Sequence, residues 1–298
     1  MEIRNLRTFR EVAERGSFTA AATALDYSQS TVSFQIRQLE EELDCLLFER
    51  MHHAIRLTER GQQLLDYAHS VLRLTEEFHQ NMEAGGDPEG SVHIVAPDSV
   101  CESILLSHYE EFYRLYPNIS LKFSTGDTGD MFRMLDRNEV DVMLTLDSHV
   151  YRQDYLIAGE QPVGMHFVTR ATSPLRQKPT LRLEDLADEA LLLTEKGMSY
   201  RSLLDKALAE RSLEVRPVLE IGRTDILLQV LKQTGISFLP DFVTAAAVHS
   251  GELIYLPVED VEIPVWKQLI YHRNKWVSRS LRAFLDFVIE KEFTGAQK

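Results

Sequence analysis

The stretch SQSTVSFQIRQLEEEL, residues 28–43, most constrains the fold, because it combines a narrow apolar stripe with an unusual polar surface. Val32, Ile36, Leu39 and Leu43 recur at steps of four, three and four residues, which is the spacing of one buried helix face. Around them the surface carries Ser, Thr, Gln, Phe and Arg up to residue 39, with hardly any of the Lys and Glu that fill most solvated faces. The pattern predicts a helix that packs on one side and presents hydrogen-bonding groups on the other.

Two shorter helices precede this one. Gly16 ends the first, Ser17 is the expected N-cap of the second, Asp26-Tyr27 forms a turn, and Ser28 caps the third helix. A helix, a short turn and a helix with exposed Gln, Ser, Thr and Arg fit a reader of the DNA major groove. The alternative is a small helical bundle with a polar surface helix.

The following segment, CLLFERMHHAIRLTERG, predicts a wing. It reads as two short strands around Leu47-Phe48 and Ile55–Leu57, joined by a tip at Met51–Ala54 and carrying Arg50 and Arg56.

Residues 17–61 resemble the winged helix-turn-helix of LysR-type transcriptional regulators. The pieces GSFTAAATAL, SQSTVSFQIRQLEEEL, LLFER and IRLTERG occur in this order without a large insertion. Three positions depart from the family pattern: Phe34 replaces a basic or polar residue, Asp44 a glycine and His53 an arginine, and all three lower the positive charge of the DNA face. The resemblance implies a sequence-specific DNA-binding transcriptional regulator.

We expect Gln and Arg to contact base edges and Ser and Thr to contact bases or phosphates. The expected DNA-binding residues are Ser17, Thr19, Gln29, Ser30, Thr31, Ser33, Phe34, Gln35, Arg37, Arg50, His53 and Arg56.

Charge and composition limit the partners. The net charge is −14, and residues 1–60 hold 8 Arg, no Lys and 10 acidic residues. DNA binding is therefore expected to use few phosphate contacts and to depend on oligomerisation. Only two cysteines occur, the N-terminus is charged rather than apolar, and no apolar run approaches the roughly 18 residues of a membrane span. A cytoplasmic protein without membrane association is the natural expectation.

A long helix is predicted from Thr58 to about Glu83, followed by a hinge at GGDPEG, residues 85–90. Its apolar positions follow a heptad pattern and indicate packing against a second copy, in agreement with the dimerising linker that the resemblance implies. The alternative is an amphipathic helix packed on its own domain. The expected dimer seam is Leu64, Ala68, Val71, Phe78 and Met82.

Strand and helix patterns alternate from residue 91 to the end, which predicts an α/β domain with a mostly parallel sheet. This part is similar to the LysR effector domain, including GMSYRSLLDKALAE and GISFLP, and the resemblance implies two α/β lobes like those of periplasmic binding proteins. The expected domains are a winged helix-turn-helix at 1–58, a linker helix and hinge at 59–90, and an effector-binding domain at 91–298. Lobe one is expected at 91–161 and 268–298, and lobe two at 162–267, with crossovers near 160 and 267.

A small effector is expected between the lobes, where strand ends and helix N-termini present free N–H groups. For each Ser and Thr of the expected effector site, helix capping is an alternative role of equal weight to ligand contact. Arg201 and Arg223 could bind a carboxylate or phosphate, which mildly favours an anionic effector. Nearby acids could instead pair with them, namely Asp98, Glu102, Asp127 and Asp225. Cys101 is either a redox sensor or, more commonly, part of an apolar wall. The expected effector-binding residues are Ser99, Cys101, Thr125, Thr128, Thr145, Ser199, Tyr200, Arg201, Arg223 and Thr224.

Two other classes of function compete with a regulator. An enzyme is disfavoured because GxSxG, GxGxxG and metal-binding spacings are absent, so no catalytic residue, metal or cofactor is expected. A pure solute-binding module is disfavoured by the helix-turn-helix. The expected partners are an operator with an interrupted inverted repeat, further copies of the chain in a dimer or tetramer, and RNA polymerase as a candidate.

Overall fold

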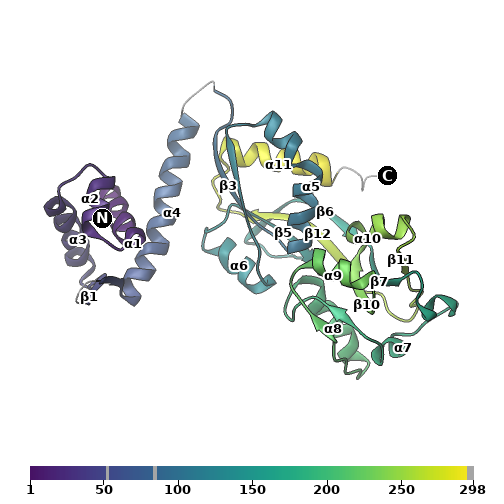
Figure 1. Cartoon of the computed structure of the whole chain (residues 1–298). Helices are drawn as coiled ribbons and strands as arrows, with labels where there is room; N and C mark the ends of the chain where they lie inside the picture. Colours follow the sequence, from purple (N-terminus) through teal and green to yellow (C-terminus); the bar gives the residue numbers. More distant parts are fainter. Residues whose placement is uncertain (52–53, 83–85, 294–298) are drawn as a thin grey trace. The chain divides into compact units, whose positions relative to one another are not determined.

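The computed structural model describes residues 1–51, 54–82 and 86–293, and the chain divides into two units, Met1–Gly86 and Asp87–Lys298 (Figure 1). The first unit contains three short helices, a two-stranded hairpin and a long helix. These elements are α1 (Ile3–Arg15), α2 (Phe18–Ala24), α3 (Gln29–Leu43), β1 (Phe48–Met51), β2 (Ala54–Leu57) and α4 (Glu59–Met82).

The helix ends follow from local chemistry. Gly16 ends α1 in the left-handed conformation, at φ 59°. The Ser17 side chain accepts a hydrogen bond from the Ala20 N–H at the start of α2, and Ser28 accepts one from Thr31 at the start of α3. Asp44 ends α3 with φ 49°, which explains why glycine suits this position better. The predicted caps are confirmed.

The core of the first unit joins all three short helices and the hairpin. Val32, Ile36 and Leu39 of α3 are buried as predicted, but Leu43 is 40% exposed. Leu43 is the last residue of α3, one turn beyond the buried part of the helix. The Phe48 ring anchors the wing, with its centroid 5.3 Å from Phe9.

The long helix α4 packs partly on its own unit. Leu64 and Ala68, two residues of the predicted dimer seam, are buried in the same core as α1 and α3. A Cβ atom at Gly61 would lie 2.1 Å from the Leu47 carbonyl oxygen, so α4 passes against the segment before β1. The prediction that these two residues face a second copy is wrong, because their own domain covers them. Val71 is half-buried and Phe78 is 51% exposed.

The second unit contains two main sheets. Their strands are ordered β4-β3-β5-β12-β6 and β10-β7-β11, and a short pair, β8-β9, accompanies the second sheet. Its elements are β3 (Gly90–Val95), α5 (Asp98–Leu115), β4 (Ile119–Ser124), α6 (Thr128–Asp136), β5 (Val142–Asp147), β6 (Tyr155–Val163), β7 (Met165–Arg170), α7 (Leu183–Ala187), β8 (Leu192–Leu193), α8 (Ser199–Glu210), β9 (Leu219–Glu220), α9 (Thr224–Leu231), β10 (Ile236–Pro240), α10 (Asp241–His249), β11 (Leu253–Tyr255), β12 (Val265–His272) and α11 (Arg279–Glu292).

The predicted α/β class is confirmed, but the mostly parallel sheet is not. In the first sheet β3 pairs in parallel with β4 and β5, whereas β12 is antiparallel to both β5 and β6. The short pair β8-β9 is also parallel. In the second sheet, β10 and β11 are both antiparallel to β7. The chain leaves the first sheet along β6 and returns along β12, so the returning strand necessarily runs the other way.

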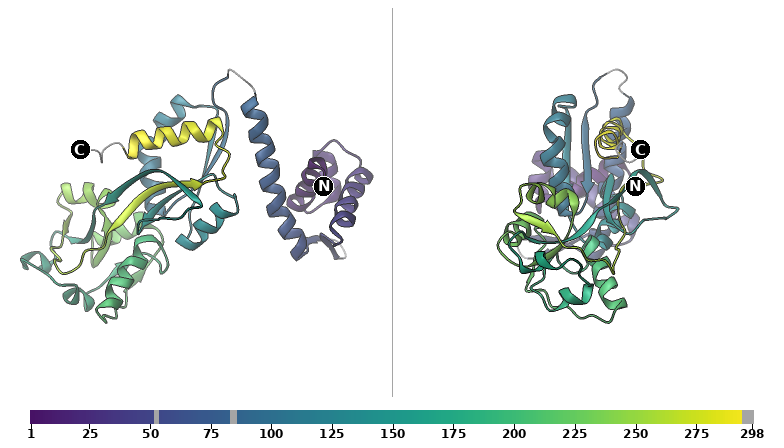
Figure 2. Two further views of the ribbon diagram at one scale, coloured as in Figure 1. Left: turned by 180° about the vertical axis from the view of Figure 1, so that it is seen from behind. Right: turned by 90° about the vertical axis from the view of Figure 1, so that its right-hand side faces the viewer.

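Helices cover both faces of the first sheet (Figure 2). Along β5, Val142, Leu144 and Leu146 join the core formed with α5 and α11, while Met143 joins the smaller core beneath α6. The sheets change between Val163 and Met165, and again before Val265, which defines two α/β lobes. Among the described residues, no helix is both long and apolar enough to cross a membrane.

Candidate DNA interface and ligand cleft

The N-terminal half of α3 forms an exposed polar surface. Gln29, Ser30 and Thr31 are all exposed. The Ser28 hydroxyl lies 2.8 Å from the hydroxyl oxygens of both Ser30 and Thr31, so three hydroxyls share one hydrogen-bonded cluster at the helix start. Such a cluster, placed at a helix N-terminus with positive dipole, suits phosphate oxygens and base edges.

Gln35 does not belong to this surface, and its prediction as a groove-facing residue is wrong. Its side chain is only 5% exposed, and its Oε1 accepts a 2.6 Å hydrogen bond from the Thr8 hydroxyl of α1. Thr8 itself is buried. Gln35 stands three residues after Val32 and four before Leu39, so it shares their buried face.

Other predicted residues of α3 remain accessible. Phe34 is 58% exposed, Arg37 is exposed and Ser33 is half-buried. An exposed aromatic ring on a polar helix face can contact a thymine methyl group in a major groove.

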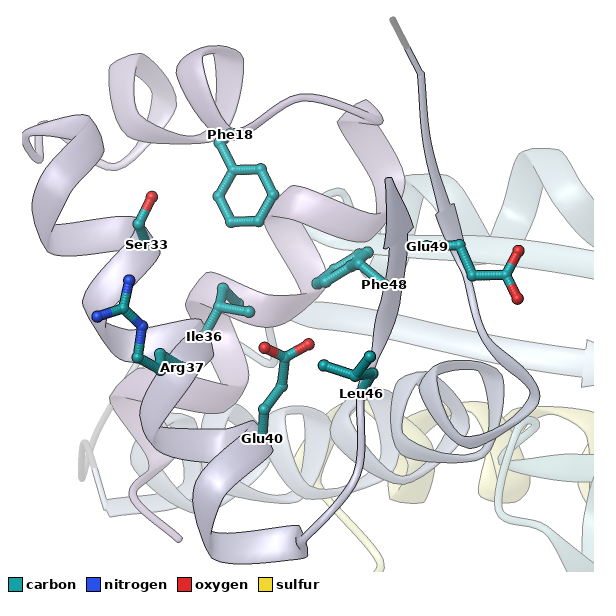
Figure 3. A pocket seen from close by; sticks show the side chains of 8 residues that line it. All are labelled: Phe18, Ser33, Ile36, Arg37, Glu40, Leu46, Phe48 and Glu49. Carbon is teal, nitrogen blue, oxygen red and sulfur yellow. The ribbon is translucent and has the colours of Figure 1, made fainter. Parts of the chain in front are cut away.

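A hollow of about 460 Å³ lies between α3, the start of α2 and β1, where Phe18, Ile36 and Phe48 form its apolar floor (Figure 3). Ser33 and Arg37, both predicted DNA contacts, stand on its α3 side. The remaining lining residues are Glu40, Leu46 and Glu49.

Glu40 of this hollow was missed at the sequence level. Its carboxylate accepts a 2.9 Å hydrogen bond from the Leu47 N–H and so fixes the entry into the wing. Its position in the last turn of α3, ahead of the wing, was the only available signal.

The wing places Arg56 on β2 as an exposed side chain, opposite Glu49 on β1. His53 lies outside the residues that the structure describes, as do the side chains of Arg50 and Met82. Ser17 caps α2, and Thr19 is exposed beside it.

In the second unit, parallel pairing brings the carboxyl ends of β3, β4 and β5 to one edge of the sheet. The Thr128 hydroxyl donates a 3.1 Å hydrogen bond to Asp147 at this edge. Thr125 is exposed, whereas Ser99 and Thr145 are buried. The Thr145 hydroxyl accepts a hydrogen bond from the Gln268 N–H of β12, so its role is structural.

Lobe two meets this edge through the start of α8. Ser199 has a positive φ of 31° and its hydroxyl donates to the Leu146 carbonyl oxygen at the end of β5. A strained non-glycine residue of this kind is typical of functional sites. Tyr200 is 3% exposed, and its hydroxyl lies beside Thr194 and Thr224 but forms no hydrogen bond of normal geometry.

Neither predicted anion-binding arginine is available for an anion. Arg201 is 3% exposed; its Nε lies 2.8 Å from Asp205, and its Nη1 lies 3.3 Å from Glu220. Arg223 is exposed, but its Nε and Nη2 donate hydrogen bonds of 2.8 and 2.6 Å to the two carboxylate oxygens of Asp225. That contact raises the pKa of the Arg223 guanidinium and lowers the pKa of Asp225. The preference for an anionic effector therefore loses its basis.

Three carboxylates gather where α5 of lobe one meets α9 of lobe two. One oxygen from each of Asp98, Glu102 and Asp225 lies within 4.8 Å of the other two. Asp98 also accepts a 3.3 Å hydrogen bond from the Thr224 N–H. Burial, and then the charges of Asp225 and Asp98, raise the pKa of Glu102. From the sequence, these acids near the two helix starts are expected only to pair with the arginines.

Cys101 is a wall residue by its surroundings. It is 6% exposed, and its Sγ donates a 3.7 Å hydrogen bond to the Ala96 carbonyl oxygen. Burial, reinforced by the charge of Asp98, raises the pKa of its thiol to about 12. The reactive thiolate is therefore scarce at neutral pH.

Two family models cover nearly the whole chain. Residues 3–62 match the bacterial regulatory helix-turn-helix protein of the lysR family, and residues 85–292 match the LysR substrate binding domain. The HTH-type transcriptional regulator YwqM of Bacillus subtilis is 31% identical over 289 residues, 96% of this chain and 98% of YwqM.

Solved structures share the fold over the whole chain. A full-length OxyR variant from Pseudomonas aeruginosa has a TM-score of 0.74 at 21% identity and covers 100% of this chain and 97% of its own. Full-length CbnR in complex with its target DNA has a TM-score of 0.67 at 20% identity, and the match covers 97% of this chain and 99% of CbnR. The helix-turn-helix, the wing, the two α/β lobes and these matches agree, and the chain belongs to the LysR family of transcriptional regulators.

Proposed function

We propose that this regulator reads an operator with the exposed N-terminal half of α3. The observation that carries the proposal is the hydroxyl and amide surface of Gln29, Ser30 and Thr31, continued by Phe34 and Arg37. Arg56 on the wing then contacts the phosphate backbone. Each bidentate side-chain contact to a base adds about 1–3 kcal/mol of discrimination, whereas backbone contacts add affinity without sequence preference.

Two copies pair through α4, along a strip that differs from the predicted seam. Tyr67, Val71, Leu74 and Phe78 follow steps of four, three and four residues, and three of them are 40–51% exposed. That spacing suits a helix pair. A two-fold dimer presents two reading heads, so its operator is an interrupted inverted repeat.

A second apolar strip supports assembly beyond the dimer. On α5, Leu106 is 80% exposed, and Tyr109 and Tyr113 are 49% and 56% exposed with stacked rings. Contiguous apolar side chains of this kind mark association surfaces. Contact between such strips on different dimers builds the tetramer.

The cleft between the lobes gates this activity. Its lobe-to-lobe contacts, Ser199 with Leu146 and Thr224 with Asp98, break when the lobes part. A ligand that contacts both lobes favours the closed arrangement by its differential affinity for the two arrangements.

The protein acts in the cytoplasm as a regulator rather than as an enzyme. RNA polymerase is its partner at the promoter.

A competition gel shift tests the DNA-reading part. Labelled DNA flanking the chain's own coding region is titrated with full-length protein, with unlabelled flanking DNA or random DNA as competitor. We expect only the flanking DNA to compete efficiently at physiological salt, because few phosphate contacts support non-specific binding. Equal competition by random DNA would contradict sequence-specific reading, and a solute-binding module would show no shift at all.

A further inference from the structure

We propose that Asp98, Glu102 and Asp225 form a site for a hard divalent cation that bridges the two lobes. The three carboxylates come from both lobes, α5 supplying two and α9 the third, and all three side chains are partly buried. An ion coordinated at about 2.0–2.6 Å holds its oxygen ligands no more than about 5 Å apart. The observed spacing, within 4.8 Å for every pair, satisfies that limit without rearrangement.

A second observation points to a ligand at the same place. Tyr200 of α8 is almost fully buried, yet its hydroxyl forms no hydrogen bond with the described residues. The hydroxyl lies beside Thr224, and the Thr224 N–H donates a hydrogen bond to Asp98 of the cluster. A buried hydroxyl without a partner costs about 1–3 kcal/mol. A water molecule held by the cation would supply the missing partner.

The charge balance favours a cation over an anion. The Arg223 guanidinium lies beside this cluster, and its direct hydrogen bonds go to the two carboxylate oxygens of Asp225. Asp98 and Glu102 have no ion pair among the described residues. Three carboxylates against one guanidinium leave an excess of negative charge, which an anionic ligand would worsen. The all-oxygen donor set suits Mg²⁺, Mn²⁺ or Ca²⁺ rather than ions that prefer nitrogen or sulfur.

The position of the site gives the cation a consequence for gating. Parting the lobes would carry Asp225 away from Asp98 and Glu102, so the complete site exists only in the closed arrangement. A cation therefore stabilises closure by the difference in its affinity for the two arrangements. This consequence rests on the proposed gating, whereas the binding of the cation does not depend on DNA.

Isothermal titration of full-length protein, freed of metal with a chelator and dialysed, tests the site with MgCl₂, MnCl₂ and CaCl₂ in turn. We expect one saturable site per chain for at least one ion, with a Kd of about 10⁻⁵–10⁻³ M, the range of carboxylate sites with incomplete protein coordination. Glu102→Gln should weaken binding about tenfold or more, because it removes a ligand charge at constant shape. Glu110→Gln, the same change at an exposed position of the same helix, should leave binding unchanged.

Arg223→Gln provides a variant with the opposite expectation. It frees Asp225 from the guanidinium, so the ion should bind several-fold more tightly, and loss of folding cannot mimic a tighter site. The absence of saturable binding for all three ions would overturn the proposal, as would equal weakening by Glu102→Gln and Glu110→Gln. Heat of binding with putrescine dihydrochloride but not with the metals would also overturn it, in favour of an organic ammonium ligand. None of these outcomes bears on whether α3 reads DNA.

Discussion

Replacing Gln35 by alanine separates a structural role of this residue from a role in reading DNA. The Gln35 amide is almost fully buried between α1 and α3 and accepts a 2.6 Å hydrogen bond from the Thr8 hydroxyl. We therefore expect Gln35→Ala to lower the stability of the first unit while leaving the preferred bases of the operator unchanged.

The expected magnitude follows from three losses. The hydrogen bond contributes about 0.5–1.5 kcal/mol, and the buried Thr8 hydroxyl, left without its partner, costs about 1–3 kcal/mol. Removing the Gln35 side chain also opens a small cavity. These terms overlap, and a total of about 2–4 kcal/mol is expected. Thr8→Val should cost less, and a double-mutant cycle should give a coupling of about 0.5–3 kcal/mol.

Hydrogen exchange measured by mass spectrometry on peptides from residues 3–43 is the suitable assay. Both tryptophans, Trp266 and Trp276, lie in the second unit, so tryptophan fluorescence does not report on the first. Gln29→Ala is the matched control, because it makes the same change at an exposed position of the same helix and should alter stability by less than about 0.5 kcal/mol. Unchanged exchange in Gln35→Ala, together with altered base preference, would refute this reasoning.

Four further perturbations have defined outcomes. Asp44→Gly should stabilise the first unit by up to about 1 kcal/mol in the same exchange assay, because glycine adopts the left-handed conformation without strain; a loss of stability would argue against that conformation. Phe78→Asp should convert dimers to monomers in sedimentation velocity, while the same substitution at exposed Gln62 should not. Arg201→Leu should destabilise the second unit by about 1–3 kcal/mol in urea titrations followed by tryptophan fluorescence. This loss is smaller than for a fully buried ion pair, because the partners Asp205 and Glu220 are partly solvated. Cys101, whose thiol pKa is raised to about 12, stays protonated at pH 8, so iodoacetamide should label Cys45 well before Cys101 in intact-mass measurements.

The sequence predicted the first unit well because its signals are local. Caps, the three-and-four spacing of apolar residues and the alternating wing strands all act over a few residues. Gln35 shows the limit: the apolar stripe alone was used to define the buried face, so polar Gln35 was assigned to the DNA surface although the structure buries it. A polar pair such as Thr8 and Gln35 is recognisable only when both helices are positioned.

The second unit was predicted less completely because its decisive contacts are non-local. The β6 strand has a weak sequence signal, because Gly159 and Pro162 interrupt its pattern and pairing with β12 holds it in place. A Cβ atom at Gly159 would lie 2.8 Å from the Phe293 ring, so close packing requires glycine there. The Arg201–Asp205 pair, in contrast, has helical i,i+4 spacing and was available from the sequence.

The carboxylate cluster required the tertiary structure. Asp98 and Asp225 are far apart in the chain, and only the packing of α5 near α9 brings their oxygens together. Side chains near helix starts are ordinarily interpreted as capping groups, which conceals a shared site.

Selection of DNA sequences from a random pool by full-length protein tests the DNA-reading role of α3 most directly. The pool is selected in parallel with wild-type protein and with Gln29→Ala. We predict that the wild type enriches an interrupted inverted repeat, and that Gln29→Ala relaxes the preference at one or two base pairs placed symmetrically in both halves. A pool without an enriched motif, or a motif that Gln29→Ala leaves unchanged while stability is also unaffected, would contradict the placement of this surface in the major groove.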